Sequence, residues 1–245
     1  MNKMLFHHKL EYNIIRKFDN DMKISSYNIQ NIFFKHKDKT LDIIKFINKY
    51  KIDILGLQEY LLKEANKFNL DSYRCVGKGR IFRKNSIFNE TCSIITNKKV
   101  ISNKSYKLPW FFTTFRRIMN VSKIKDNKNE YLVINTHLDH LNKMCQKKQL
   151  NYIYKFLSNI DNKNNIILMG DFNLDLNNKT FINFTSKLSS IGINRVEITD
   201  KTYKNLDKPI DHIFISSNIK LLDKKVIIDD SLDISDHYPL YVEIK

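Results

Sequence analysis

Short apolar runs that end in polar side chains recur along the chain. The clearest of these segments is Ile166 to Met169, which predicts a short strand that is buried on both faces. Gly170 ends this run, and Asp171 and Asn173 follow it. Because they lie two positions apart, the last two side chains leave an extended chain on the same side, at the rim of a sheet. Asp and Asn are also typical of a simple Asx turn, so this stretch alone leaves both interpretations open.

Further predicted strands follow the same pattern. Residues 23–28 end at Asn28, residues 52–58 lead into Glu59, and residues 131–136 lead into His137. Two later runs are reversed, since polar residues precede the strands at 212–215 and 238–244. If the earlier strands point toward one rim and the last two run away from it, their polar groups meet there. The expected members of that rim are Asn28, Glu59, His137, Asp171, Asn173, Asp211, Asp236 and His237.

Helical spacing of apolar residues predicts helices at 38–50, 142–158 and 179–188. The expected buried stripes are Leu41, Ile44 and Ile47 in the first helix, and Leu150, Ile153, Tyr154 and Leu157 in the second. Between residues 73 and 125 the pattern changes to short strands, among them 92–96 and 115–124. The strand, helix, strand opening is typical of a mixed α/β protein. We therefore expect one α/β domain over 23–245, preceded by an N-terminal extension at 1–22.

Several segments resemble, in order along the chain, the signature segments of the endonuclease/exonuclease/phosphatase superfamily. They are SYNIQ, LGLQE, NTHLDH, GDFN, IDHIFIS and SDHYPL. The resemblance extends from about Lys23 to the C-terminus. It implies a four-layer sandwich of two stacked mixed β-sheets flanked by helices. It also implies an enzyme, a divalent-metal-dependent hydrolase of phosphoester bonds.

Composition bears on the substrate. The formal net charge of +16, from 42 Lys and Arg against 26 Asp and Glu, favours a polyanionic partner. A nuclease acting on DNA or RNA is therefore the leading hypothesis, although a general bias toward Lys and Asn gives the same charge. The alternative is a phosphatase or phosphodiesterase of a small or lipid phosphoester, such as an inositol phosphate or sphingomyelin. A non-catalytic phosphate-binding relative is a third hypothesis, and it predicts losses among site residues that are all present.

The resemblance and the chemistry of phosphoester hydrolysis together predict roles for the rim residues. Hard oxygen ligands suit Mg²⁺ or Mn²⁺, and Glu59 is the expected carboxylate ligand, with Asn28 beside it. A single Glu at a strand end is otherwise a common surface acid. By resemblance, His237 is the general base and Asp211 its partner, while Asp236 lies on the metal side or orients the water. These two acids also fit turns that open strands.

The remaining rim residues take their roles from the same resemblance. Asp171 and Asn173 are expected to hold the attacking water and the phosphate, and His137 contacts the phosphate or acts as an acid. Glu90 is a candidate to support that second histidine. Arg116 or Arg117 is a candidate phosphate clamp, and the nearby Trp110, Phe111 and Phe112 form either a stacking platform or part of the core, with a solvated Arg pair.

The cysteines indicate a reducing compartment. Cys75, Cys92 and Cys145 have neither close pairing nor metal-ligand spacing. The sequence shows no signal-peptide core and no apolar run of membrane-spanning length. We expect a cytoplasmic protein that acts as a monomer.

Overall fold

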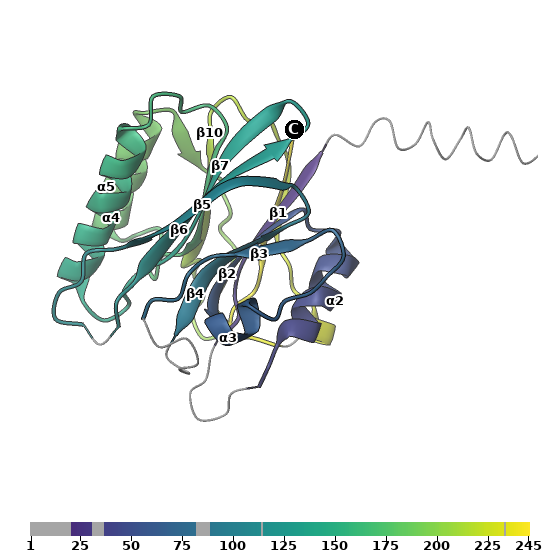
Figure 1. Cartoon of the computed structure of the whole chain (residues 1–245). Helices are drawn as coiled ribbons and strands as arrows, with labels where there is room; N and C mark the ends of the chain where they lie inside the picture. The colour runs from purple at the N-terminus through teal and green to yellow at the C-terminus, as the bar shows by residue number, and fades with distance from the viewer. Residues whose placement is uncertain (1–20, 31–36, 82–88, 114, 233) are drawn as a thin grey trace, which may run out of the picture.

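The strands assemble into two six-stranded sheets in the computed structural model, which describes residues 21–30, 37–81, 89–113, 115–232 and 234–245 (Figure 1). The predicted extension at 1–22 lies almost wholly outside the described residues. Sheet A has the order β11 (Leu221–Val226), β12 (Leu240–Ile244), β1 (Met22–Asn28), β2 (Ile54–Leu61), β4 (Glu90–Thr96) and β3 (Arg74–Val76). Sheet B has the order β5 (Lys99–Lys107), β6 (Ile118–Asp126), β7 (Asn129–His137), β8 (Ile166–Asp171), β10 (Asp211–Ser216) and β9 (Ile193–Arg195).

In the described ranges each sheet contains one parallel pair of strands, and these pairs determine where the polar strand ends lie. β1 runs parallel to β2, and β7 runs parallel to β8. β12 is antiparallel to β1, and β10 is antiparallel to β8. The strands that end in polar residues therefore point in one direction within each sheet, and those that begin with polar residues start from the same edge. The predicted strand directions are confirmed.

Helices cover the outer faces of both sheets. α4 (Lys143–Ser158) and α5 (Lys179–Ser189) lie on sheet B, whereas α2 (Thr40–Tyr50) lies on the far side with sheet A (Figure 1). A short helix, α3 (Leu62–Ala65), and a 3-10 turn at Asp230–Leu232 complete the elements. Three apolar clusters separate the layers. The central cluster joins the two sheets through residues such as Ile24, Ile54, Val242, Val133, Ile167 and Met169. The fold is an α/β sandwich of two mixed sheets with helices outside, as predicted.

Local sequence signals explain where α4 and α5 begin. The Asn142 side chain accepts hydrogen bonds from the backbone N–H groups of Met144 and Cys145, each at 3.0 Å. Asn178 caps α5 in the same way. An Asn at this position satisfies N–H groups that have no partner within the helix. The predicted helix boundaries therefore agree with the structure to within about two residues, the usual uncertainty of such ends.

The predicted buried face of the first helix was wrong in part. Leu41 is 73% exposed, and the residues of α2 that are buried are Ile43, Phe46 and Ile47. These belong to a second apolar stripe at helical spacing that includes an aromatic ring, and burying it removes more apolar surface from water. The helix is consequently rotated relative to the prediction. In α4, Leu150, Ile153 and Leu157 are buried as expected, and Tyr154 is half-buried.

The strand predicted at 115–124 begins later than expected, at Ile118. The backbone N–H of Leu108 donates to the carbonyl of Arg117 at 2.9 Å, which closes the connection between β5 and β6. Residues 115–117 therefore belong to the loop rather than to the ladder. Among the described residues, no helix is both long enough and apolar enough to cross a membrane.

Candidate active site

The strand ends of sheet B bring three titratable side chains together. Asp171, at the end of β8, lies opposite His137 in the parallel pairing with β7. It also lies opposite Asp211 in the antiparallel pairing with β10. All three side chains are buried. The register of the central strands therefore places one carboxylate between a histidine and a second carboxylate.

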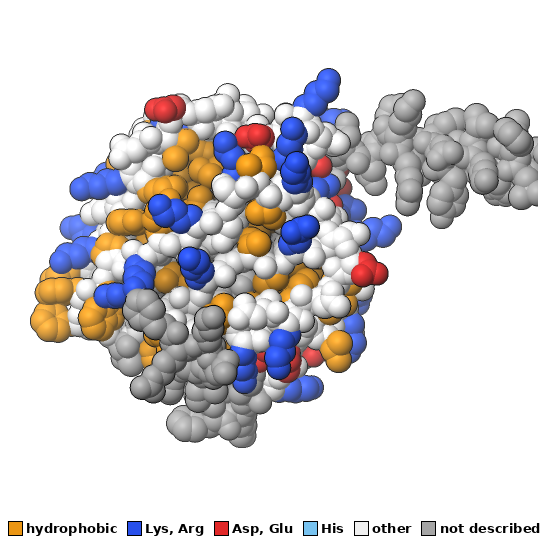
Figure 2. All heavy atoms as spheres, in the orientation of Figure 1, with side chains coloured by type: hydrophobic (Ala, Val, Ile, Leu, Met, Phe, Trp, Pro, Cys, Tyr) orange, Lys and Arg blue, Asp and Glu red, His pale blue; other side chains and the backbone are white. Residues whose placement is uncertain are grey.

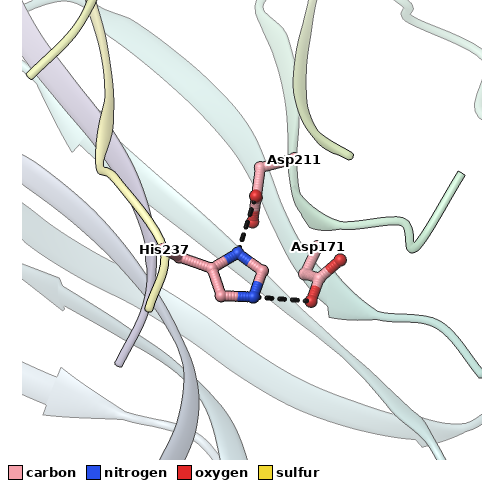
Figure 3. Close-up of side chains that lie close together, drawn as sticks. All are labelled: Asp171, Asp211 and His237. Carbon is pink, nitrogen blue, oxygen red and sulfur yellow. Dashed lines mark hydrogen bonds and ion pairs between the residues drawn. The ribbon is translucent and has the colours of Figure 1, made fainter. Parts of the chain in front are cut away.

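His237 approaches this group from the loop before β12 of sheet A (Figure 3). Its Nδ1 donates to Asp211 Oδ2 at 2.8 Å, and its Nε2 lies 3.9 Å from Asp171 Oδ2. Burial alone would lower the pKa of His237, but the nearby carboxylates, with Asp211 foremost, raise it to about 10. Burial and the charge of Asp211 raise the pKa of Asp171. At neutral pH the imidazole therefore carries a proton and a positive charge between two acids.

Both oxygens of Asp171 are engaged, and they serve different purposes. Oδ1 accepts the backbone N–H of Asn173 at 2.8 Å, which forms the Asx turn. Oδ2 accepts Asn28 Nδ2 at 2.9 Å and faces His137 Nε2 at 3.4 Å. Asn173 has a positive φ of 52°, and its Nδ2 donates to the carbonyl of Leu138 at 3.1 Å. The Asx turn and the site are thus both present, and the turn fixes the carboxylate that serves the site.

The ends of β1 and β2 contribute a second group of oxygen atoms. Asn28 Nδ2 also donates to Glu59 Oε1 at 3.2 Å, which connects sheet A with Asp171 of sheet B. Glu59 adopts a positive φ of 60° where a register shift interrupts the pairing of β2 with β4. Such a bulge re-aims a side chain. Asp236 accepts Gln30 Nε2 at 2.6 Å, and burial followed by the charge of Glu59 raises its pKa.

This oxygen group fits a divalent cation. The carboxylate of Glu59 is close enough to Asp236 to raise the pKa of Asp236, and a neutral amide, Asn28, lies beside Glu59. Hard oxygen donors of this kind suit Mg²⁺ or Mn²⁺. Asp171, Asp211 and His237 also present three possible ligand atoms within 4.8 Å of one another. In that trio the raised pKa of His237 keeps its imidazole protonated at neutral pH, which disfavours it as a ligand and leaves the oxygen group as the better candidate.

Arg117 links His137, at the end of β7, with His140. One guanidinium nitrogen lies 3.0 Å from His137 Nδ1, and another lies 3.1 Å from His140 Nδ1. Because arginine can only donate, both Nδ1 atoms must accept, and the remaining proton of each neutral imidazole is on Nε2. Burial, together with Arg117 and Arg80, lowers the pKa of His137 well below its usual range. His137 is therefore a neutral N–H donor that points toward Asp171.

The weaker sequence candidates occupy distinct places. Arg117 is buried, so the prediction of a solvated arginine pair was wrong for this residue, and its Nε has no hydrogen-bond partner among the described residues. Arg116 is exposed and lies 5.3 Å from the ring of Trp110. Glu90 forms a buried ion pair with Arg80 at 2.8 Å, and the contact on His137 comes from Arg117 instead. The aromatic residues 110–112 are exposed rather than part of the core.

Three further residues contact the site, although the sequence analysis gave none of them a role. Gln30 holds both Asp236 and, through its backbone N–H, Asn28 Oδ1 at 3.0 Å. Lys39 Nζ donates to the carbonyl of Gln30 at 2.5 Å and lies near Glu59 and Asp236, whose charges oppose the lowering of its pKa by burial. The Tyr203 ring packs on His237 with centroids 4.9 Å apart. Gln30 ends the SYNIQ segment, which could have indicated it, whereas only the three-dimensional arrangement identifies Lys39 and Tyr203.

Comparisons with known proteins identify the family and the fold. The model of the endonuclease/exonuclease/phosphatase family matches residues 25–237. The endonuclease/exonuclease/phosphatase from Bacteroides vulgatus is similar in structure, with a TM-score of 0.78 and 17% identity over 93% of this chain and 99% of that one.

Two further solved structures are also similar. The mannosyl-6-phosphatase of Bacteroides thetaiotaomicron has a TM-score of 0.71 and 20% identity, over 91% of this chain and 99% of that chain. The catalytic domain of human nocturnin with a bound sulfate anion has a TM-score of 0.74 and 17% identity, over 92% and 94%. A sequence search of curated proteins found no match. With its strand ends, its central Asp171 and a family match over most of its length, the chain belongs to the endonuclease/exonuclease/phosphatase family.

Proposed function

We propose that this chain is a divalent-metal-dependent phosphoester hydrolase whose reaction centre is Asp171. The observation that carries the proposal is the environment of its Oδ2 atom. Asn28 from sheet A, His137 from sheet B and His237 from the loop before β12 all direct nitrogen atoms at it. Such convergence of buried titratable groups is typical of catalytic sites.

Glu59, Asp236 and Asn28 would hold Mg²⁺ or Mn²⁺ at the edge of this centre. When bound, the cation neutralises phosphoryl oxygens and stabilises the leaving oxygen. Gln30 and Lys39 position these ligands, because Gln30 contacts both Asp236 and Asn28, and Lys39 binds the carbonyl of Gln30.

The proton of the attacking water has two possible acceptors within the centre. The raised pKa of His237 means that its imidazole already holds a proton at neutral pH. Burial and the charge of Asp211 raise the pKa of the Asp171 carboxyl group. When ionised, Asp171 is therefore a stronger proton acceptor than a carboxylate of ordinary pKa. We therefore assign proton acceptance to Asp171, held by Asn173, and assign His237 with Asp211 to stabilising negative charge on the phosphoryl group. The sequence had predicted His237 itself as the base.

His137 and Arg117 complete the proposed phosphoryl site. The neutral His137 offers Nε2–H to an oxygen, and Arg117 fixes that tautomer while adding positive charge at its back. Within the described part of the chain, Arg117 Nε is buried without a partner, which costs free energy unless a ligand or water satisfies it. Arg116 is exposed at the rim and is available to a larger substrate.

Nucleic acid is the first substrate class that we propose. The charge of +16 supports it, because phosphate backbones attract clustered Lys and Arg. A lipid or small phosphoester is the second substrate class that we propose. Exposed apolar side chains beside Arg117 and His140 favour a lipid phosphoester within this class. The similarity to a mannosyl-6-phosphatase also supports a small monoester. The free cysteines support a cytoplasmic location, and we expect a monomer.

The test is a hydrolysis screen of the purified chain with Mg²⁺ or Mn²⁺. The substrates are single- and double-stranded DNA, RNA, abasic DNA, inositol phosphates, sugar phosphates and sphingomyelin. We expect turnover of one class, and its loss in an Asp171→Asn variant prepared in parallel. A protein that binds phosphate and metal but hydrolyses none of these would contradict the proposal and indicate a non-catalytic relative.

A further inference from the structure

Large apolar side chains are exposed on one edge of the molecule, outside the candidate active site. Phe112 is 84% exposed, Leu141 is 66% exposed and Met144 is 56% exposed, and Trp110 and Phe111 lie beside them. The Asn142 side chain joins the two segments, because its Nδ2 lies 3.3 Å from the carbonyls of both Phe111 and Phe112. We call these five apolar residues the apolar tip.

The apolar tip protrudes where the β5–β6 connection meets the start of α4. Hydrophobic side chains gather at that edge of the space-filling view, at the lower left, with Lys and Arg side chains above them (Figure 2). Contiguous apolar surface of this kind on a protein surface marks an interaction site.

A collar of positive charge surrounds the apolar tip. Lys148 Nζ lies 4.4 Å from the ring of Phe111, and Arg116 lies 5.3 Å from that of Trp110. Lys143 and Lys147 are exposed on the first turns of α4. The sequence contains no acidic residue from 97 to 125 or from 140 to 160. The partner of this edge must therefore be both apolar inside and negatively charged at its surface.

We propose that the apolar tip docks this protein on an anionic lipid surface. The tip enters the boundary between headgroups and acyl chains, and the collar of Arg116, Lys143, Lys147 and Lys148 contacts the anionic headgroups. Aromatic and aliphatic side chains with a rim of Lys and Arg are the composition that interfacial membrane binding requires. Each Lys or Arg held near an anionic leaflet strengthens binding by roughly fivefold.

Stacking of nucleic-acid bases fits the apolar tip less well. Cations already lie against the rings of Trp110 and Phe111. The Phe111 and Phe112 rings pack edge to face with centroids 4.3 Å apart. Base stacking needs open aromatic faces. Leu141 and Met144 have no ring to offer, whereas both suit an acyl environment.

The apolar tip is continuous with the candidate active site. Arg117 contacts His137, which faces Asp171, and it also contacts His140, the residue before Leu141. Docking would therefore hold the phosphoryl site beside the lipid headgroups. This part of the inference rests on the proposed function, and of the two substrate classes proposed above it favours the second, as a membrane lipid phosphoester. The docking itself does not depend on catalysis.

Trp110 is the one tryptophan of the chain and lies within the apolar tip, so its fluorescence reports docking directly. The full chain, kept metal-free with chelator to prevent hydrolysis, is titrated with phosphatidylcholine vesicles that contain or lack phosphatidylserine. We expect a blue shift of the emission with the anionic vesicles and quenching by lipids brominated on their acyl chains. An unchanged spectrum with anionic vesicles would overturn the proposal.

Variants distinguish vesicle binding through the apolar tip from binding through exposed apolar side chains elsewhere on the surface. Phe112→Ser with Leu141→Ser should weaken vesicle binding by about tenfold or more, because both side chains lose their burial in lipid. The matched control is Leu41→Ser with Ile228→Ser, which alters residues that are 73% and 66% exposed elsewhere, and it should bind as the unchanged protein does. Lys147→Gln with Lys148→Gln should weaken binding by roughly 20-fold. Equal binding by all of these proteins would contradict the proposal.

Two other occupants give different results. Quenching of Trp110 by single-stranded polynucleotide, without any vesicle-induced blue shift, would assign the tip to base stacking and overturn lipid docking. A vesicle-independent dimer that Phe112→Ser with Leu141→Ser dissociates would also overturn it. Because the readout is metal-free fluorescence, its failure is distinct from a failure of the hydrolysis screen.

Discussion

At the scale of single residues, the site depends on the different partners of the two carboxylate oxygens of Asp171. Oδ1 is held by the N–H of Asn173, so the carboxylate cannot rotate freely. Oδ2 is thereby directed at Asn28, His137 and His237. A local turn and a catalytic group are often treated as competing interpretations of Asp-x-Asn. Here the turn is the means by which the acid is preorganised.

His237→Ala should lower turnover by roughly 100-fold or more, because it removes the positively charged imidazole between Asp171 and Asp211. Asp211→Asn should lower turnover by about tenfold or more, since the amide no longer holds the imidazolium. Steady-state kinetics on the best substrate of the screen measure both effects, and circular dichroism checks that the variants fold. Near-native turnover of His237→Ala would remove this residue from the mechanism.

The pKa of His237 also predicts a pH dependence of stability. Its folded pKa is raised to about 10 from 6.5, so the stabilisation that its charge provides is complete below about 6.5 and is lost as the pH rises toward 10. The unfolding free energy of the metal-free protein should therefore fall over this range, and more steeply than that of His237→Gln. Urea denaturation at several pH values measures the difference. Parallel slopes for the two proteins would show that the charge of His237 contributes nothing.

Sequence reasoning identified residues that terminate strands and missed those that act across the fold. Asn28, His137 and Asp171 could be predicted because short apolar runs show where buried strands end. Arg117 could not be distinguished from Arg116, because the orientation of neighbouring loop residues depends on the closure between Leu108 and Arg117. Tyr203 belongs to no motif, and only its packing on His237 reveals it.

At the scale of elements, Gly170 shows how the strand supporting the site is fixed. It adopts a φ of 148°, and a Cβ placed there would lie 1.9 Å from the backbone oxygen of Thr136 in β7. The close approach of β7 and β8 places His137 next to Asp171. A side chain at this position would force apart the two strands that carry the site.

Gly170→Ala should destabilise the protein by roughly 2 to 4 kcal/mol, through backbone strain and a clash with backbone that cannot move aside. Gly192→Ala is the matched control. It also has a positive φ, of 79°, but its Cβ would meet only Ser217 Oγ at 3.5 Å, so we expect a loss of about 1 kcal/mol. Chemical denaturation measures both. Equal losses would show that the contact between the strands does not matter.

The helices show the limit of periodicity at this scale. The pattern predicted α2 correctly as a helix but assigned its buried face to Leu41 instead of Ile43 and Phe46. The sequence contains two overlapping apolar stripes, and the surface of sheet A determines which one is buried. The starts of α4 and α5 were predicted from helical spacing alone, and the local caps at Asn142 and Asn178 explain them.

At the scale of the whole molecule, the site exists because two sheets are stacked. Asn28 and Glu59 come from strands of sheet A, whereas His137, Asp171 and Asp211 come from sheet B. A Cβ placed on Gly56 of β2 would lie 2.7 Å from Met169 Cε of β8, which shows how closely the sheets approach. Periodicity indicated mixed α/β structure, and only the family resemblance predicted the stacking. Contacts between sheets have no period along one chain.

The central claim is that an oxygen-ligated divalent cation at Glu59, Asp236 and Asn28 is required for hydrolysis. The most direct test is turnover of the best substrate in excess chelator, followed by restoration of Mg²⁺ or Mn²⁺, for the unchanged protein and for Glu59→Gln. We predict that turnover is lost with chelator and returns with either ion. Glu59→Gln should need roughly 10-fold more metal or stay inactive. Full turnover in excess chelator would contradict the account.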